Sequence, residues 1–369
     1  MSFASSLAFP YILGALAAAA ATAFVATPVA MWLAKRLGAI DQPGAARRVH
    51  ARPIPRGGGL AVAVAFVGVG LVALRLVEGL DRAPELGSLG SREIIVLFGG
   101  AALAAVLGFA DDVLQLRARW QLLLQLVLAG VAVGGGVTIA AVNNPFGGGV
   151  IAFAQPFAVV FTVLWVVGMI NSINFIDGLD GLSSGISLIA ALTLGAISLT
   201  TSLDQPEVAL FCAVLAGSLA GFLPRNFHPA RVFIGTSGVY LIGFALGILS
   251  ILGTAKVAVA MLVLGVPIID TFWIIVRRLL AGQSPFTPDR GHLHHRLLDL
   301  GLGHRDVVLV IYALCGVLAV LSLVLSGTGQ LYAFVGFVVV GGAVLYVLTR
   351  RTQEALEASS YEEPEVPSG

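Results

Sequence analysis

The chain has 369 residues, of which 58% are hydrophobic and 11% are charged. One water-soluble core cannot bury so many apolar residues, so the composition excludes an ordinary soluble domain and predicts a protein solvated by lipid. The formal net charge of +1 gives no indication of a nucleic-acid partner. The two cysteines lie in separate apolar stretches, which indicates neither a disulfide framework nor a zinc framework.

Long apolar stretches recur from the N-terminus onward. A helix needs about 20 apolar residues to cross about 30 Å of hydrocarbon, and about eleven stretches meet that requirement. The sequence therefore predicts an all-α fold, a polytopic bundle of membrane helices over residues 1–349 with polar loops between them. The predicted spans are 8–34, 57–77, 92–110, 120–142, 156–172, 182–202, 207–223, 238–252, 255–276, 307–326 and 331–349. The 45 glycines interrupt many of these stretches, which favours close packing of helices within a bilayer.

Basic residues predict the orientation of the chain in the membrane. With the N-terminus outside, seventeen of the 21 Lys and Arg residues fall in loops on the inner side. Since positive loops stay in the cytoplasm, we expect a multi-pass protein of the cell membrane with its N-terminus outside and its C-terminus inside. Residues 350–369 carry Glu, Ser and Pro without an apolar pattern, so we expect a disordered cytoplasmic tail.

The first polar segment on the inner side is basic and rich in proline and glycine. It contains Asp41, Arg48 and His50 and ends in the run Gly57–Gly59. A basic loop that contacts anionic headgroups explains it in structural terms. Alternatively, the glycines allow backbone N–H groups to approach a phosphate closely.

The second segment is the acidic pair Asp111 and Asp112 at the end of an apolar stretch. Carboxylates are costly within a bilayer, so the pair is expected at the interface or in a polar cavity. Two neighbouring carboxylates suit magnesium binding or proton abstraction. An ordinary acidic pair at a helix end is the competing interpretation.

The third segment is the most informative one. Asn171, Asn174, Asp177 and Asp180 recur at every third position, which places successive members on one face if the backbone is helical. The nearby glycines loosen the helix, and the backbone groups they free must line a cavity. Four spaced polar residues exceed what a single turn needs.

Two further segments carry basic residues. Arg225 and Arg231 precede the small-residue run 235–238, and they indicate either a phosphate grip or snorkelling arginines in a connecting loop. The last segment runs over 289–296 and contains arginines together with three histidines. It indicates a polyanion site, with zinc binding as the competing interpretation. Its candidate residues are Arg290, His292, His294 and His295.

Together and in this order, from Asp41 to Arg305, these segments resemble the polyprenyl-phosphate N-acetylhexosamine-1-phosphate transferases. The run Asp289–Arg296 is more similar to the WecA/TagO branch than to the MraY branch, which implies UDP-N-acetylglucosamine as the donor. The resemblance implies transfer of sugar 1-phosphate to a polyprenyl phosphate in the membrane, release of UMP and the start of a cell-envelope polysaccharide. It also implies Mg²⁺ as the cofactor, with Mn²⁺ as an alternative, and leaves a homodimer open.

The resemblance also implies roles for single residues. The acidic pair lies near the acceptor and the metal, Asn174 is a magnesium ligand, and Asn171, Asp177 and Asp180 shape the nucleotide-sugar pocket. The arginine and histidines of the last segment hold the donor diphosphate. The catalytic set implied is Asp111, Asp112, Asp177, Asp180 and His294; Asp41, Arg48, His50, Asn171, Arg290, His292 and His295 bind substrate; Asn174, Asp112 and Thr236 hold the metal.

Two positions depart from the family pattern. Thr236 stands where the family has a magnesium-binding aspartate, and Gln121 stands where a lysine is common. These changes keep a second hypothesis open, a catalytically silent homologue that binds lipid phosphate or nucleotide sugar. A secondary transporter is a third hypothesis, for which only Asp270 is a candidate ionisable group near the membrane midplane.

Overall fold

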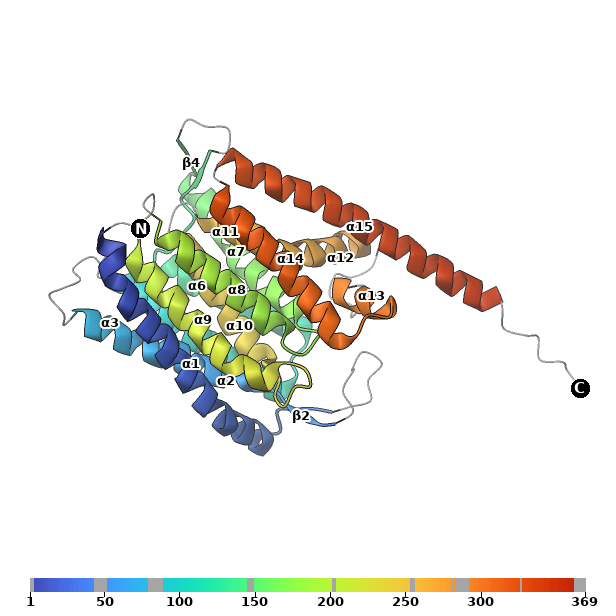
Figure 1. Cartoon of the computed structure of the whole chain (residues 1–369), viewed down its shortest axis with the longest axis horizontal. Helices are drawn as coiled ribbons and strands as arrows, with labels where there is room; N and C mark the ends of the chain where they lie inside the picture. The colour runs from blue at the N-terminus through green and yellow to red at the C-terminus, as the bar shows by residue number, and fades with distance from the viewer. Residues whose placement is uncertain are drawn as a thin grey trace, which may run out of the picture.

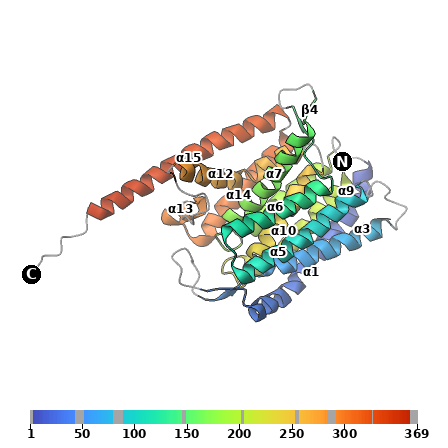
Figure 2. The ribbon, with the colours of Figure 1, turned by 180° about the vertical axis from the view of Figure 1, so that it is seen from behind.

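The computed structural model describes residues 3–42, 52–78, 89–144, 149–200, 204–252, 256–280, 282, 292–325 and 327–361. These residues form a bundle of long helices with two short β-hairpins (Figures 1 and 2). The all-α class predicted from the sequence is therefore confirmed.

The helices and strands follow the chain in a simple order. The first half comprises α1 (Phe3–Leu37), β1 (Ile40–Asp41), β2 (Ile54–Pro55), α2 (Gly58–Ala63), η1 (Val64–Val69), α3 (Gly70–Glu78), α4 (Ser91–Ile94), η3 (Ile95–Gly99), α5 (Gly100–Leu114), α6 (Ala118–Gly134), β3 (Ala141–Asn143), β4 (Val150–Ala152) and α7 (Gln155–Ile176). The second half comprises α8 (Leu182–Ser198), α9 (Pro206–Asn226), α10 (Gly235–Ile251), α11 (Lys256–Val263), α12 (Gly265–Leu280), α13 (Leu293–Asp299), α14 (His304–Val324) and α15 (Thr328–Tyr361). The π-helical segments η1 and η3 continue their neighbours, so 58–78 and 91–114 are each one helical rod.

Every predicted span contains a helix, although the helices differ in length and the span predicted over 120–142 runs past the end of α6 at Gly134 into β3. Within the described residues, six helices are long and apolar enough to cross a membrane. A seventh is obtained if α11 and α12, which meet at a bend of 77°, count as one broken span. Four shorter apolar helices, of 10–17 residues, account for the remaining predicted stretches. The protein is thus a polytopic membrane protein.

Two helices form the centre of the bundle. All residues from Gly235 to Ser250 in α10 are buried, and so is nearly all of α9. An apolar helix without a polar face must be surrounded by other helices or by lipid. Here α10 packs against α5 and α7, while α9 packs against α1 and α8.

Glycines allow α9 to lie very close to α1. A Cβ atom at Gly217 would lie 2.1 Å from the carbonyl oxygen of Leu16, and one at Gly221 would lie 2.0 Å from that of Ala20. Glycines four residues apart are the pattern that lets membrane helices approach backbone to backbone. The abundance of glycine predicted this kind of packing, and the structure confirms it.

The two hairpins lie toward opposite ends of the bundle. The β3–β4 hairpin lies near the N-terminus, whereas the β1–β2 hairpin and α13 lie toward the other end (Figure 1). In the β1–β2 hairpin Ile40 pairs with Pro55 and Asp41 with Ile54. Next to it, Arg56 forms a parallel bridge with Phe233, which ties the hairpin to the chain just before α10.

The C-terminal tail differs from the prediction. We expected disorder from residue 350, but α15 continues to Tyr361 and projects away from the bundle (Figure 1). The stretch 353–358 reads Gln-Glu-Ala-Leu-Glu-Ala, and all four of these residue types have high helix propensity, which outweighs the missing apolar pattern. Residues 362–369 lie outside the described part of the chain.

Candidate active site

The predicted polar segments meet at the end of the bundle that holds the β1–β2 hairpin. Arg56 lies 3.6 Å from Asp41 and 4.0 Å from Asp112, measured from guanidinium nitrogen to carboxylate oxygen. Asp112 and Asp180 both act electrostatically on Asp177. The adjacent Gly178 has its Cα against the ring of His294, since a Cβ there would lie 2.1 Å from Nε2. These interactions link the first, second, third and last of the predicted segments. The remaining segment, 225–238, contacts Asp112 and Asp180.

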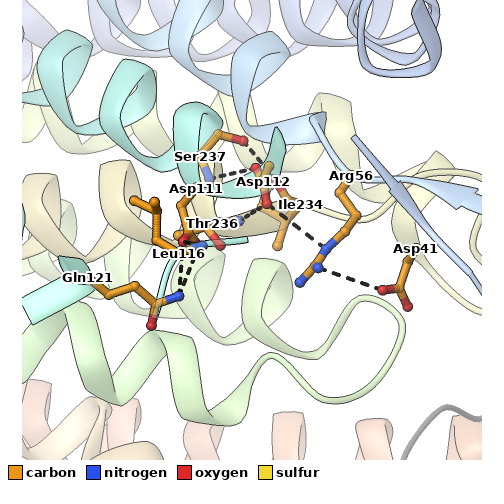
Figure 3. A network of polar contacts seen from close by, with 9 residues as sticks. All are labelled: Asp41, Arg56, Asp111, Asp112, Leu116, Gln121, Ile234, Thr236 and Ser237. Carbon is orange, nitrogen blue, oxygen red and sulfur yellow. Dashed lines mark hydrogen bonds and ion pairs between the residues drawn. The ribbon is translucent and has the colours of Figure 1, made fainter. Parts of the chain in front are cut away.

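Asp112 is a cap for helix α10. Its Oδ1 accepts the backbone N–H of Thr236 at 2.7 Å, and its Oδ2 accepts that of Ser237 at 3.0 Å (Figure 3). These N–H groups have no partner within their own helix, and a carboxylate also interacts favourably with the positive end of the helix dipole. Gly235, at φ 70°, makes room, because a Cβ there would lie 2.6 Å from Oδ2. The Asp112 side chain is 0% exposed.

Asp111 faces a different set of partners. Its Oδ1 accepts the backbone N–H of Leu116 at 3.0 Å, and the amide of Gln121 donates to its two oxygens at 3.0 and 3.1 Å (Figure 3). Gln121 thus contacts the acidic pair at the position for which the resemblance noted above implies a lysine. It supplies a hydrogen bond there without a compensating positive charge.

The glycine run Gly57–Gly59, which forms the N-cap and first two residues of α2, donates its N–H groups within the protein. Gly57 and Gly58 donate to the carbonyl of Phe233, and Gly59 donates to that of Ile234 at 2.8 Å. A Cβ at Gly59 would lie 1.9 Å from the nitrogen of Gly238. The glycines therefore allow α2 to pack against the start of α10, and the prediction that they approach a phosphate is wrong.

Asn171 belongs to a buried polar network beneath the site. Its side-chain nitrogen donates to Gln125 at 2.6 Å and to the carbonyl of Val167 at 2.9 Å. Gln125 in turn lies 3.5 Å from the hydroxyl of Tyr240. These bonds connect α6, α7 and α10, so Asn171 stabilises the packing of these helices. Its predicted contact with substrate stays a prediction.

The third segment is helical only in its first half. Helix α7 ends at Ile176, a turn follows, and α8 begins after Gly181, whose φ is 80°. Asn171 and Asn174 therefore lie on α7, whereas Asp177 and Asp180 lie in the turn. The prediction of a helix loosened by glycine is confirmed, but the four side chains do not share one helical face.

Asp177 carries a carboxyl group whose pKa lies close to cellular pH. Burial raises its pKa to about 6, against the lowering effects of the Ser183 hydroxyl and of Arg56; Asp112 and Asp180 raise it further. The Ser183 hydroxyl donates to Oδ1 at 2.5 Å. The residue is half-buried, so a ligand can reach it. A carboxylate with a pKa near neutrality is suited to accept a proton at cellular pH.

Asp180 joins three parts of the chain. Its Oδ2 lies 2.8 Å from Nδ1 of His228 and accepts the N–H of Ala230 at 3.0 Å. Its own N–H donates to Nε2 of His304, at the start of α14, at 3.0 Å. Tyr312 of α14 donates to the carbonyl of Gly181 and holds the same turn. His304 and Tyr312 were not predicted as site residues.

The histidine segment is hydrogen-bonded to Asp270 of α12. His292 Nδ1 lies 2.8 Å from Asp270 Oδ2, and Asp270 Oδ1 accepts the N–H of Leu293 at the start of α13. Asp270 thus positions the histidines, so it gives no support to the transporter hypothesis.

His294 is 1% exposed, and neither ring nitrogen has a hydrogen-bond partner within the described residues. Burial, followed by His295, His292 and His304, lowers the pKa of His294 well below its usual range. It is therefore neutral near pH 7, so the positive charge of the predicted polyanion site has to come from the arginines. His295 lies next to it, with ring centroids 4.3 Å apart.

Three predicted site residues, Arg48, His50 and Arg290, lie outside the described residues.

The residues present fit a magnesium ion in part. Magnesium keeps several waters when it binds carboxylates, which a fully covered Asp112 carboxylate does not allow. Thr236 is 7% exposed and has no carboxylate. Asn174 and Asp177 fit a magnesium ion better, because both are half-buried at the end of α7 and offer side-chain oxygen atoms as ligands.

The chain matches known proteins over nearly its whole length. Residues 94–254 match the model of glycosyl transferase family 4. A probable undecaprenyl-phosphate N-acetylglucosaminyl 1-phosphate transferase of Bacillus subtilis is 36% identical, with 86% of each chain covered. A decaprenyl-phosphate N-acetylglucosaminephosphotransferase of Mycobacterium tuberculosis is 37% identical over 91% of this chain and 88% of its own. A phospho-N-acetylmuramoyl-pentapeptide-transferase of Moorella thermoacetica is 36% identical, but over only 39% of this chain.

The chain therefore belongs to the family of polyprenyl-phosphate N-acetylhexosamine-1-phosphate transferases, membrane enzymes that the fold and the site had already indicated.

Proposed function

We propose that this protein transfers N-acetylglucosamine 1-phosphate from a UDP-sugar to a polyprenyl phosphate and releases UMP, starting a cell-envelope polysaccharide. The observation that carries the proposal is the meeting of acidic, amide and histidine segments around Asp177 at one end of a membrane bundle. The full-length relatives that carry this activity in their names support the same substrates.

In this reaction an oxygen of the lipid phosphate attacks the phosphorus that carries the sugar. The bond from that phosphorus to the oxygen shared with UMP breaks, and UMP leaves with that oxygen. Asp177 takes the proton of the lipid phosphate if it arrives protonated, since its pKa of about 6 matches that of a phosphate monoester. The neutral His294 is buried against Gly178 and supports the turn that carries Asp177, and its contact with the donor diphosphate stays an expectation from the family resemblance.

Magnesium is the cofactor of this proposal and would be held by Asn174 together with substrate phosphates, which leaves the Asp177 carboxylate to accept the proton. A bound magnesium ion screens the charge of the phosphates. Asp112 then acts through α10 and not as a direct ligand, which departs from the assignment by family resemblance.

A direct assay tests the activity. Purified protein is mixed with polyprenyl phosphate and a panel of UDP-sugars, and UMP release is measured. UMP release with UDP-N-acetylglucosamine supports the proposal. Binding of UDP-sugar without UMP release identifies the silent homologue instead, and release with a different UDP-sugar corrects the donor.

Thr236 leads to a prediction about magnesium. Thr236→Asp places a second carboxylate beside Asp112 at the start of α10, and two buried like charges repel each other unless a cation lies between them. We expect a lower melting temperature without magnesium, recovery when magnesium is added, and UMP release that saturates at lower magnesium than in the wild type. Thr236→Asn is the neutral control of similar size. Identical magnesium titrations for all three proteins would show that position 236 is not near a metal.

The orientation of the site is a further prediction. The charge distribution predicts that the β1–β2 hairpin, the turn after α7 and α13 lie in the cytoplasm. Since Cys212 and Cys315 are buried, a single new cysteine reports on its own surroundings. We expect Arg119→Cys to react with a membrane-impermeant reagent only in opened cells, and Ser91→Cys to react in intact cells. The reverse pattern would place the site outside and exclude a cytosolic donor.

A further inference from the structure

A compact group of nitrogen and oxygen ligands lies beside the proposed active site. The residues Asp180, His228 and His304 each offer one ligand atom, and these atoms lie within 4.8 Å of one another. They come from three separate parts of the chain, the turn after α7, the loop after α9 and the first turn of α14. All three residues are partly buried.

One pair of ligand atoms, on Asp180 and His228, is already close to the separation that a bound ion requires. Zinc binds imidazole nitrogen and carboxylate oxygen at about 2.0–2.2 Å, so ligand atoms around a tetrahedral ion lie about 3.3 Å apart. Asp180 Oδ2 and His228 Nδ1 are already 2.8 Å apart, and an ion between them requires a separation only about half an ångström larger. The two imidazole rings have centroids 4.3 Å apart and are inclined by 22°.

Only one of the two ring nitrogens of His304 has a hydrogen-bond partner within the described residues. Its Nε2 accepts the N–H of Asp180, so the proton of a neutral ring is on Nδ1. Nδ1 is buried, and the described residues provide it with no hydrogen-bond partner. A cation bound through Nδ1 requires the ring proton to move to Nε2, so the Asp180 N–H gives up its contact with Nε2 when the ion binds.

We propose that Asp180, His228 and His304 form a binding site for a transition-metal dication such as Zn²⁺. Two imidazoles and one carboxylate are typical of zinc sites that keep a fourth position open for water or another ligand. Magnesium prefers oxygen ligands, so this site discriminates against it and is distinct from the magnesium site of the transfer reaction. A bound ion joins the turn after α7 to the start of α14 and stabilises both.

Hydrogen bonds from neighbouring residues hold Asp180 and His228 in place. Ala230 donates its N–H to Asp180 Oδ2 at 3.0 Å, and Arg305 Nε donates to the carbonyl of His228 at 3.2 Å. The first bond orients the Asp180 carboxylate, and the second holds the backbone of His228. An ion therefore replaces the contact between His228 and Asp180 without unfolding the segment.

Metal binding is measured without turnover, so the outcome is independent of the proposed reaction. The full chain is purified in detergent, treated with a chelator and titrated with Co²⁺, whose visible absorption reports its coordination; Zn²⁺ and Mg²⁺ are then added as competitors. We expect one Co²⁺ per chain, displacement by Zn²⁺ but not by Mg²⁺, and a higher melting temperature with Zn²⁺. His228→Ala and His304→Ala should weaken binding at least about tenfold, the least that loss of a metal-site partner typically costs.

Matched variants identify the site. His295→Ala removes a histidine of the neighbouring cluster and should bind Co²⁺ like the wild type. If His304→Ala does not fold, His304→Gln keeps an acceptor for the Asp180 N–H and removes the imidazole. The proposal is overturned if the wild type takes up no Co²⁺, if the His228 and His304 variants bind as tightly as the wild type, or if His295→Ala alone abolishes binding.

Discussion

Replacing Asp177 with asparagine is expected to lower UMP release at least about a hundredfold, because removal of one preorganised electrostatic group at a transferring phosphoryl centre costs about 2.7–4 kcal/mol. Asparagine has nearly the same shape and still accepts the hydrogen bond of Ser183, so the fold should be retained. The measurement is the rate of UMP release at saturating substrates, with a melting curve for each protein. Wild-type turnover in Asp177→Asn would place the chemistry elsewhere.

The pH profile separates proton transfer by Asp177 from a merely structural role. A base acts in its deprotonated form, so kcat/KM of the wild type should rise with pH through about 6, the pKa to which burial raises this carboxyl group. Ser183→Ala is the matched variant. The Ser183 hydroxyl stabilises the carboxylate, so its loss raises the pKa of Asp177 and should move the rise of the profile to higher pH. An unchanged profile in Ser183→Ala would argue against Asp177 as the base.

The fold followed from the sequence because membrane helices leave a strong and local signal. Apolar stretches of about 20 residues are needed wherever the backbone must satisfy its own hydrogen bonds in lipid. The bend between α11 and α12 was not predicted, although Gly265 and Pro267 lie at it and both residue types interrupt or kink helices. The helical tail to Tyr361 was missed because the absence of an apolar face was given more weight than intrinsic helix propensity.

The site was predictable as a set of residues but not as a set of roles. Asp112 and Asp111 are neighbours in sequence, yet one caps α10 and the other bonds to Gln121. Adjacent helical residues point in different directions, and their partners are set by tertiary packing. Arg56 illustrates the same limit, since its position between Asp41 and Asp112 depends on how the β1–β2 hairpin folds back. His304 had one sequence signal, its place at the start of an apolar helix after a glycine turn.

Asp112→Asn is expected to lower both the stability and the activity of the protein. The Asp112 carboxylate accepts two N–H groups, from Thr236 and Ser237, with one oxygen for each. An asparagine side chain has one oxygen, so one N–H is left facing an amide NH₂ in a buried place. A buried donor without a partner costs about 1–3 kcal/mol. Loss of the negative charge also removes a favourable interaction with the N-terminus of α10, worth up to about 2 kcal/mol in partly buried sites.

Asp111→Asn is the matched control. Its oxygen can still accept the Leu116 N–H, and its NH₂ can donate to the oxygen of Gln121 once the Gln121 amide rotates. The melting temperature of Asp111→Asn should therefore stay near that of the wild type, while that of Asp112→Asn falls by several degrees. If Asp112→Asn instead melts like the wild type and loses only turnover, Asp112 acts on the substrate or the metal. In that case the family assignment describes it better than the helix cap seen in the structure.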